Sequence, residues 1–332
     1  MSGLLVVDDL SRGFPARRGF QAMLRGGPRP VVWALNGVSL RVERGETLAV
    51  VGESGCGKST LARALVRLTE LDGGQIVFDG EDVRGLGGAA LRRYNRRVQM
   101  VFQDPYGSLN PRMTVGQTLD EALQVHEMVP PERRPARVAE LLGLVRLPSD
   151  AADRLPHEFS GGQRQRQRIA IARALSIEPE LLIADEIVSA LDVSVQAQIL
   201  NLLLDLQNRL GLAILFVSHD LRVVRHLAHR VAIMYLGRVV ETGPADAVFD
   251  APRHPYTKAL LRAAPSMDPP QPGAHRAPRE AALAGELPRP LDIPSGCPFH
   301  PRCPEARGRC STKVPRIHVA DLHHMATCHL LG

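Results

Sequence analysis

The stretch that decides the fold reads Thr47-Leu48-Ala49-Val50-Val51, then Gly52-Glu53-Ser54-Gly55-Cys56-Gly57-Lys58-Ser59-Thr60, then Leu61-Ala62-Arg63-Ala64-Leu65. The apolar run at 47–51 predicts a strand buried on both faces, and residues 61–65 have the composition of a helix. A glycine-rich loop of this form, between a strand and a helix, wraps phosphate groups with its backbone N–H groups. We expect Lys58 to contact the β- and γ-phosphates and the Ser59 hydroxyl to ligate Mg²⁺. The purely structural alternative is a glycine-rich turn that binds no ligand.

The same pattern of apolar runs continues on both sides of this loop. Leu181 to Ala184 and Leu212 to Val217 are further continuous apolar runs, and helix-like segments alternate with such runs from about 35 to 240. This alternation predicts an α/β domain with a largely parallel sheet, whose ligand lies beyond the carboxyl ends of the strands. Val231 to Tyr235 and Arg238 to Glu241 are expected to form a hairpin.

Composition limits the classes of protein to which the chain can belong. At 332 residues and 44% hydrophobic, it can bury a sizeable core. Its apolar runs are far shorter than the roughly 20 residues of a membrane-spanning helix, and its start lacks the features of a secretory leader. No zinc-finger spacing or aromatic-interleaved basic motif accompanies the net charge of +6, so no nucleic-acid partner is expected. We expect a cytoplasmic protein.

Two adjacent carboxylates end the apolar run at 181–184. Asp185 is placed to hold Mg²⁺, directly or through water, and Glu186 to orient and deprotonate an attacking water. Acids at strand ends also cap helices, so the pair alone is weakly specific. Beside a phosphate-binding loop, the pair indicates nucleotide hydrolysis.

A second glycine-containing turn, Phe159-Ser160-Gly161-Gly162-Gln163, opens a helix-like segment that runs from Arg164 to Leu175. Ser160 has the chemistry of an N-cap, and the two glycines permit close backbone approach to a phosphate. The turn resembles the signature sequence of ABC-transporter ATPases, although Phe159 stands where leucine is usual. In that family the signature reaches the nucleotide held by the other subunit of a dimer, which implies that one chain supplies half of each site.

Other motifs of that family follow in order over nearly the whole chain. Gln103 resembles the Q-loop glutamine, which senses Mg²⁺ and the attacking water and couples to the membrane subunits. Ser189-Ala190-Leu191-Asp192 resembles the D-loop, with Asp192 near the nucleotide, and His219 resembles the switch histidine that contacts the γ-phosphate. The resemblance therefore implies an ATPase with Gln103, Glu186 and His219 in catalysis, and with Mg²⁺ held by Ser59, Gln103 and Asp185.

One further position departs from the family pattern, and one role of the family has no single candidate residue. Ile187 replaces the proline that normally follows the catalytic glutamate, which could alter the stiffness of the turn and the turnover rate. The aromatic side chain that stacks on adenine has three candidates, Phe14, Phe20 and Trp33, of which we assign Phe14.

Several stretches resemble one branch of the family, the ATP-binding subunits of oligopeptide, dipeptide and nickel importers: 52–60, 108–113, 188–200, 254–261 and 297–304. Residues 188–194 and 235–238 resemble the second of the two ATPase subunits that such importers usually carry. The resemblance implies a heterodimer with a sister ATPase, docked on two transmembrane permease subunits at the cytoplasmic face of the membrane. An extracellular or periplasmic solute-binding protein would supply the cargo, for which we expect peptides, with nickel or another small solute as the alternative.

The family also sets the expected architecture. We expect an α/β P-loop NTPase core with a β-rich N-terminal part, spanning 1–262, with an inserted helical subdomain at about 104–160. After it, Ala263 to Ser295 is dense in Pro, Ala and Gly, which is typical of a linker. Residues 263–332 would then comprise this linker and a small cysteine-containing extension.

Four of the five cysteines stand in the last 36 residues: Cys297, Cys303, Cys310 and Cys328. Their spacings, in a reducing compartment, favour a metal or cluster over four unrelated thiols. Zinc usually has closer cysteine pairs, although His300 and His329 keep zinc open. Importers of this branch carry a [4Fe-4S] cluster on such a tail, and the resemblance implies one on these four cysteines. We interpret Cys56 as a small loop residue whose thiol oxidants could modify.

Two alternatives come from other classes of protein. Soluble ABC ATPases that act on ribosomes or DNA commonly fuse two ATPase domains or insert a coiled coil, and this sequence shows neither. A regulatory binding module with defective catalysis is the second alternative, motivated by Ile187 beside the catalytic acid.

Overall fold

The computed structural model describes residues 3–16, 29–159, 162–263, 288, 291–321 and 324–331. The main sheet has the strand order β11-β12-β10-β9-β3-β8-β7-β6. Its parallel strands are β3 (Thr47–Val51), β6 (Val98–Val101), β7 (Leu181–Asp185), β8 (Ala213–Ser218) and β9 (Arg230–Tyr235). The strands expected at the three apolar runs are confirmed, and so is the α/β class.

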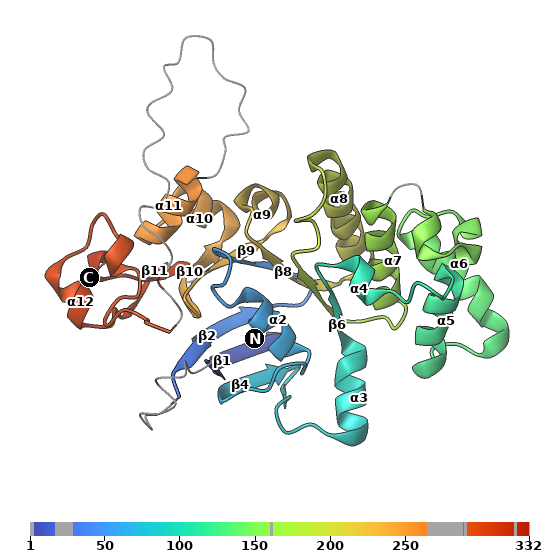
Figure 1. The fold of residues 1–332 in the computed structure, drawn as a ribbon, viewed down its shortest axis with the longest axis horizontal. Helices are drawn as coiled ribbons and strands as arrows, with labels where there is room; N and C mark the ends of the chain where they lie inside the picture. Colours follow the sequence, from blue (N-terminus) through green and yellow to red (C-terminus); the bar gives the residue numbers. More distant parts are fainter. Residues whose placement is uncertain are drawn as a thin grey trace, which may run out of the picture.

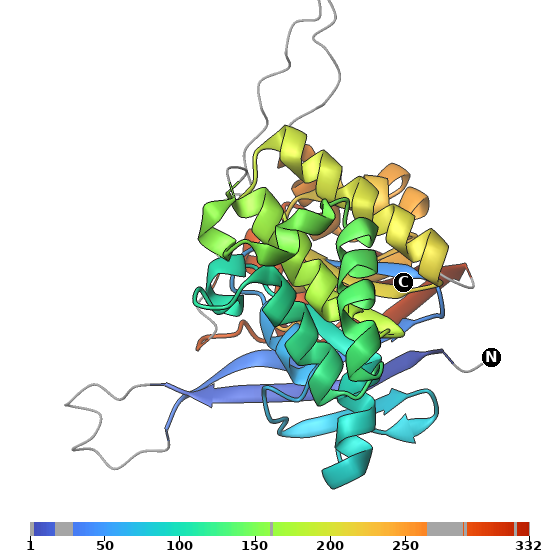
Figure 2. The same cartoon turned by 90° about the vertical axis from the view of Figure 1, so that its right-hand side faces the viewer.

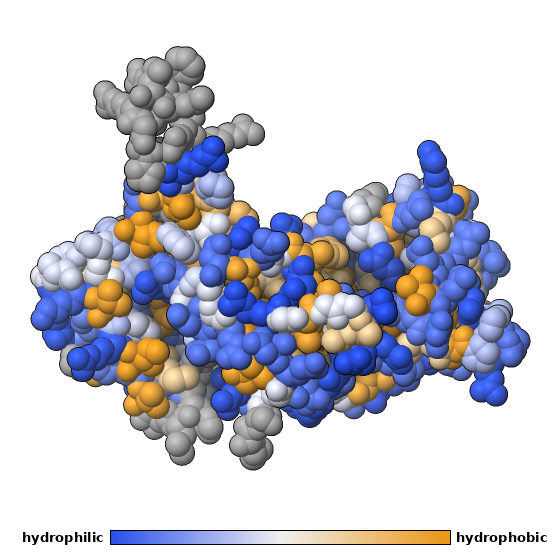
Figure 3. Space-filling model, turned by 90° about the horizontal axis from the view of Figure 1, so that it is seen from below, coloured by the Kyte–Doolittle hydropathy of each residue, from blue (hydrophilic) through white to orange (hydrophobic). Residues whose placement is uncertain are grey.

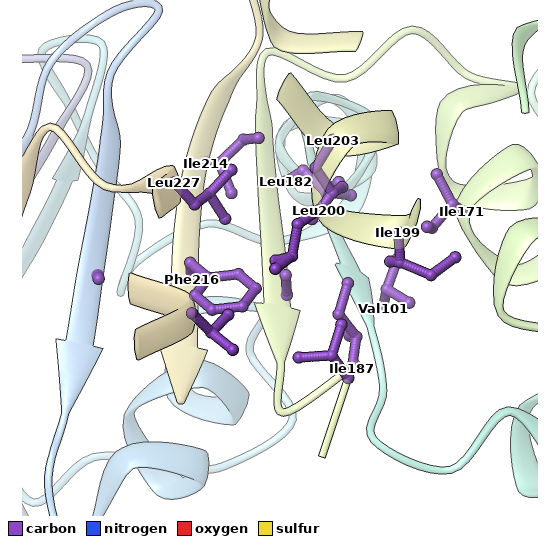
Figure 4. Packing of buried hydrophobic residues seen from close by; sticks show 14 of the residues in the cluster. Val101, Ile171, Leu182, Ile187, Ile199, Leu200, Leu203, Ile214, Phe216 and Leu227 are labelled. Carbon is purple, nitrogen blue, oxygen red and sulfur yellow. The ribbon is translucent and has the colours of Figure 1, made fainter. Parts of the chain in front are cut away.

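Both faces of this sheet are buried, which explains why its strands read as continuous apolar runs. Along β7, Leu181 and Ile183 belong to the core that faces the N-terminal sheet, whereas Leu182 and Ala184 belong to the core under the helices. Figure 4 shows the second core, in which Leu182 and Phe216 pack against Leu200 and Leu203 of α8 (Val193–Leu210).

The N-terminal part is rich in β-structure, as expected, and it forms a separate antiparallel sheet. Its order is β2-β1-β4-β5, formed by β1 (Leu5–Pro15), β2 (Val31–Val42), β4 (Gly73–Phe78) and β5 (Glu81–Asp82). Figures 1 and 2 show this sheet on the opposite side of the main sheet from α8. Helices α2 (Lys58–Leu65) and α3 (Gly88–Arg97) complete this side of the molecule.

A group of helices follows β6 and stands to one side of the sheets (Figure 1). It contains α4 (Pro105–Ser108), α5 (Val115–Val125), α6 (Arg134–Leu144) and short 3₁₀ turns at Pro131–Arg133, Ser149–Asp153 and Pro156–Glu158. Thr114 and Gln117 form a capping box at the start of α5. Helix α7 (Gln163–Leu175) packs against this group and leads into β7.

The last part of the chain returns to the main sheet. The predicted hairpin is confirmed as β9 and β10 (Arg238–Pro244), joined by Leu236 and Gly237 with φ of 44° and 76°, the conformation of a tight hairpin turn. Strand β12 (His324–Thr327) pairs with β10, and β11 (Ile317–Asp321) pairs with β12. The remaining elements are α9 (Leu221–Leu227), α10 (Ala245–Asp250), α11 (Pro255–Ala263), α12 (Gly308–Thr312) and 3₁₀ turns at His300–Arg302 and His329–Leu331.

The surface seen from below in Figure 3 is mostly hydrophilic, with hydrophobic residues in small separate groups. Within the described part of the chain, no helix has the length and apolar character needed to cross a bilayer.

Candidate functional site

The glycine-rich loop joins β3 to α2, as the sequence predicts. Backbone oxygens of two other strands crowd it: a Cβ on Gly52 would lie 2.2 Å from Met234 O, and one on Gly57 would lie 2.1 Å from Ala34 O. Gly57 also has φ of 108°, in the region that favours glycine. Both positions therefore require glycine if the loop is to keep this path between β2 and β9.

The side chain of Lys58 is almost fully buried inside the curve of this loop. Its Nζ donates hydrogen bonds to the carbonyl oxygens of Gly52 at 2.8 Å and Glu53 at 3.1 Å. It also lies 3.7 Å from Oε1 of Glu186. The ammonium group is thus held where the loop, α2 and the end of β7 meet.

The two acids predicted at the end of β7 face the start of α2. The Ser59 hydroxyl donates to Oδ1 of Asp185 at 3.0 Å. Burial raises the pKa of Asp185 above its ordinary value, and the Ser59 hydrogen bond partly opposes that shift. Ser59 and Asp185 thus offer neighbouring oxygen atoms of the kind that Mg²⁺ prefers.

Glu186 occupies a left-handed backbone conformation, with φ of 48°. Its N–H donates to Val217 O at 3.0 Å, and its carbonyl oxygen accepts from Ser189 N–H at 3.1 Å and Ser189 Oγ at 2.9 Å. These contacts, together with packing, stabilise a conformation that non-glycine residues rarely adopt. The packing comes from Ile187, which is buried and lies beside Val101 (Figure 4). Where the family has proline, this chain therefore anchors the turn with a buried isoleucine.

Two further predicted residues contact this turn. His219, after β8, is half exposed and has Nδ1 3.5 Å from Oε1 of Glu186. Gln103, after β6, donates from Nε2 to Ser189 Oγ at 3.4 Å. Lys58, Ser59, Asp185, Glu186 and His219 thus gather at the carboxyl ends of β3, β7 and β8, where the parallel sheet predicts a ligand. Asp192 stands immediately before α8.

Part of the second turn lies outside the described residues. Ser160 and Gly161 are among those not described, whereas Gly162, with φ of 51°, precedes the first residue of α7, Gln163.

The candidates for stacking on adenine lie on the N-terminal sheet, apart from Phe20, which is outside the described residues. Phe14 is 38% exposed on β1 and Trp33 is 39% exposed on β2, and Gly13 pairs with Trp33. The Arg12 guanidinium lies 4.9 Å from the centre of the Phe14 ring. Both rings are therefore accessible, and exposure alone does not choose between them.

Two contacts to the loop residue Glu53 were not predicted from the sequence. Its N–H donates to the Tyr256 hydroxyl at 3.1 Å, and its carboxylate accepts from Arg302 at 2.7 Å and 3.0 Å. Tyr256 and Arg302 stand in stretches that resemble the importer branch, at 254–261 and 297–304. That resemblance was the available signal, but nothing in it indicates that these side chains reach the loop.

The predicted [4Fe-4S] cluster on Cys297, Cys303, Cys310 and Cys328 is wrong. The four residues line one pocket with His300 and His329, yet no three or more His, Cys, Asp or Glu side chains in the described ranges are arranged to hold a metal ion. All five cysteines are free thiols. In the absence of a metal, burial raises the pKa of Cys303 to about 11 and also raises the pKa of Cys297 and of Cys328. The lack of such an arrangement among the described residues also contradicts a zinc site on these cysteines.

Cys56 lies in the phosphate-binding loop and is buried. Burial raises the pKa of its thiol as well, which disfavours the reactive thiolate.

Comparison with known proteins identifies the family. Residues 35–189 match the model described as ABC transporter, and residues 240–310 match the model described as oligopeptide/dipeptide transporter, C-terminal region. A probable peptide ABC transporter ATP-binding protein, y4tS of Sinorhizobium fredii, is 52% identical, covering 98% of this chain and 90% of that protein. The di/tripeptide transport ATP-binding protein DppF of Pseudomonas aeruginosa is 48% identical, covering 99% and 98%. The dipeptide transport ATP-binding protein DppF of Escherichia coli is 49% identical, covering 95% and 90%.

Solved structures agree with this grouping. The cbiO1 protein of Clostridium perfringens, part of the ABC transporter complex cbiONQ, has a TM-score of 0.63 and 27% identity, covering 76% of this chain and 92% of that one. The ATP-binding cassette MJ0796, in a dimeric post-hydrolysis state bound to ADP and Pi, has a TM-score of 0.61 and 26% identity, covering 73% and 98%. The names of the y4tS protein and of the two DppF proteins refer to ATP binding, and none of these three names mentions an iron–sulfur group. With this coverage and identity, the chain belongs to the ATP-binding, ATP-hydrolysing proteins of the ABC transporter family, in the group with the oligopeptide/dipeptide transporter C-terminal region.

Proposed function

We propose that this chain is the subunit whose ATP hydrolysis powers the import of di- or oligopeptides through a membrane ABC transporter. One observation carries the proposal. Lys58, Ser59, Asp185 and Glu186 meet at the ends of β3 and β7, in a chain about half identical to proteins named for peptide transport.

The loop residues are proposed to bind the triphosphate. The N–H groups at 52–60 and the start of α2 would face the phosphates, and Lys58 would exchange its contacts with Gly52 and Glu53 for phosphate oxygens. The oxygens of Ser59 and Asp185 are of the kind that Mg²⁺ prefers, and we propose Gln103 as a further ligand. When bound, Mg²⁺ would offset negative charge on the β- and γ-phosphates.

Glu186 is proposed to orient and deprotonate the attacking water. Its carboxylate contacts both Lys58 and His219, at 3.7 Å and 3.5 Å. When Lys58 turns to the phosphates, Glu186 would keep His219 as a neighbour and gain room for a water. His219 is then placed to sense the γ-phosphate from the side of β8.

The complete site is proposed to need a second ATPase subunit. Among the described residues, the polar partners of Lys58 are Gly52, Glu53, Cys56 and Glu186, all near the loop, whereas Gly162 and Gln163 stand at the start of α7. The MJ0796 cassette, similar over 73% of this chain, was solved as a dimer. We propose that 160–163 and Asp192 complete the partner's site, and that the partner is a sister ATPase of different sequence.

The remaining partners and domains follow from the same family. We propose docking on two transmembrane permease subunits at the cytoplasmic face of the membrane, with cargo delivered by an extracellular or periplasmic solute-binding protein. The ATPase domain would span 1–262, with its helical subdomain at about 104–160, and 263–332 would be an appended linker and extension. Two separate family matches, at 35–189 and 240–310, support the presence of two regions, and the second match begins within the proposed ATPase domain.

The test is uptake by the complex reconstituted in liposomes with its permeases, sister ATPase and solute-binding protein. We expect ATP-dependent accumulation of a labelled dipeptide, and none with Glu186→Gln in this chain. Uptake of Ni²⁺ in place of peptide would transfer the proposal to the alternative cargo. Vigorous ATP hydrolysis without association with any permease would contradict a transport role and favour a soluble ABC ATPase.

A further inference from the structure

A residue of the C-terminal extension is bound to the phosphate-binding loop. Arg302 ends the 3₁₀ turn His300–Arg302, and its side chain is 4% exposed. Its Nη1 and Nη2 donate to the two carboxylate oxygens of Glu53, at 2.7 Å and 3.0 Å, across 249 residues of sequence. Two parallel hydrogen bonds from a planar guanidinium fix both the distance and the orientation of a carboxylate.

The extension is anchored beside this contact by an aromatic cluster. The ring of Phe299, which is buried, lies with its centre 5.3 Å from the ring centres of both Tyr235 and Tyr256. The Tyr256 hydroxyl in turn accepts the N–H of Glu53 at 3.1 Å. The C-terminal part of the chain therefore holds Glu53 by its backbone and by its side chain.

Glu53 is also in direct contact with the residue that would meet the phosphates. Its carbonyl oxygen accepts from Lys58 Nζ at 3.1 Å. The orientation of the Glu53 peptide therefore bears on the position of Lys58. Moreover, an unpaired carboxylate in this loop would repel a triphosphate, and the Arg302 cation offsets that charge.

We propose that Arg302 is a positioning residue for nucleotide binding: by pairing with Glu53 it orients and neutralises a carboxylate of the phosphate-binding loop, so that the C-terminal extension sets ATP affinity. The inference rests on the proposed role of residues 52–60 in binding ATP.

The test measures binding of a fluorescent ATP analogue, with Mg²⁺, to the full-length chain. We expect Arg302→Met to weaken affinity about tenfold, or about 1.4 kcal/mol, because the Glu53 carboxylate is left unpaired near the phosphates. Arg302→Lys keeps the positive charge but loses the bidentate hydrogen bonding to Glu53, so the affinity of this variant for the ATP analogue should be intermediate. Adding Glu53→Gln to Arg302→Met should recover most of the loss, since the repelling charge is then gone.

A readout beyond overall stability separates positioning from simple loosening of the extension. The loss in Arg302→Met should be larger for the ATP analogue than for the ADP analogue, since the repulsion scales with phosphate charge. In the assembled complex, the KM for ATP should rise while kcat changes little. Arg316→Met, an exposed arginine of the same extension, is the matched control and should bind like the wild-type chain.

Two outcomes would overturn the inference. One is equal affinity of Arg302→Met and Arg316→Met, whatever their thermal stabilities. The other is a loss in Arg302→Met that Glu53→Gln does not relieve. If Arg302→Met does not fold, Arg302→Lys with and without Glu53→Gln makes the same comparison. Failure of the wild-type chain to bind ATP would instead refute the proposed function.

Discussion

Lys58 and Glu186 are ion-paired, with 3.7 Å between Nζ and Oε1, and both side chains are largely buried. The cation assigned to the phosphates and the carboxylate assigned to the water therefore neutralise each other. Under the proposed roles, a bound triphosphate would compete with Glu186 for Lys58 and would separate the two side chains. ATP binding would then also release the Glu186 carboxylate to act as the general base.

Glu186→Gln should abolish turnover without abolishing binding. Loss of a general base typically costs roughly 10²–10⁴-fold in rate, and removal of the carboxylate also removes the competitor for Lys58. We expect ATP affinity equal to or higher than that of the wild-type chain. Phosphate release by the assembled complex and equilibrium ATP binding are the measurements; undiminished hydrolysis would refute the assignment of Glu186 as the base.

Asp185→Asn should stabilise the nucleotide-free chain at neutral pH. Burial raises the pKa of Asp185, so the folded state binds the Asp185 proton more tightly than the unfolded state does. The contribution of Asp185 to the free energy of unfolding therefore falls as the pH rises from the ordinary pKa of an aspartate to the raised pKa of the folded chain. Asparagine keeps an oxygen for the Ser59 hydroxyl but carries no charge. We expect a higher Tm near pH 7, with the advantage over wild type shrinking toward about pH 4.

The matched control for this change is the exposed residue Asp153, as Asp153→Asn. It should leave the pH profile of Tm as in the wild-type chain.

The stabilised Asp185→Asn chain should also lose the Mg²⁺ dependence of ATP binding, because an amide oxygen is a weaker Mg²⁺ ligand than a carboxylate. An Asp185→Asn chain that is less stable than wild type at neutral pH would contradict this expectation.

Gly57→Ala should disrupt the phosphate-binding loop. The new Cβ would lie 2.1 Å from Ala34 O, a backbone atom, at a φ of 108° that alanine disfavours. We expect a loss of more than about 1 kcal/mol in the free energy of unfolding, together with loss of ATP binding. Gly143→Ala, in α6 with no atom within 4 Å of the added Cβ, is the control. It should be neutral, or stabilising by up to about 1 kcal/mol, in denaturant titrations.

Phe14→Ala should weaken ATP and ADP binding to a similar extent. Stacking of a base on an aromatic ring is worth about 1–3 kcal/mol by alanine substitution, and it involves the adenine rather than the phosphates. Trp33→Ala is the direct comparison, because Trp33 has nearly the same exposure on the neighbouring strand. A selective loss in Trp33→Ala would move the stacking role to that residue.

Much of the fold could be predicted because the deciding signals are local. The strand at 47–51, the turn at 236–237 and the helix after 57 each follow from hydrophobic periodicity or from glycine at a left-handed position. The acids at 185 and 186 were placed correctly relative to the loop because parallel strands bring their carboxyl ends to one edge. The consequence of Ile187 was not predictable, because it depends on packing against Val101 from another strand.

The cysteine prediction failed for a related reason. Spacing in sequence suggested a metal-binding set, but ligation depends on the relative directions of side chains and on their thiolate form. These directions are set by how the extension packs, and the described residues include no group of His, Cys, Asp or Glu arranged to hold a metal ion.

By itself, then, the sequence determined the phosphate-binding loop, the strand-end acids and the family, since short-range sterics and backbone hydrogen bonding dictate these features wherever the motif occurs. Only the tertiary structure decided that the extension joins the main sheet through β12 and reaches Glu53 through Arg302. Contacts between residues 249 positions apart depend on the whole folded path of the chain, and no local pattern records them.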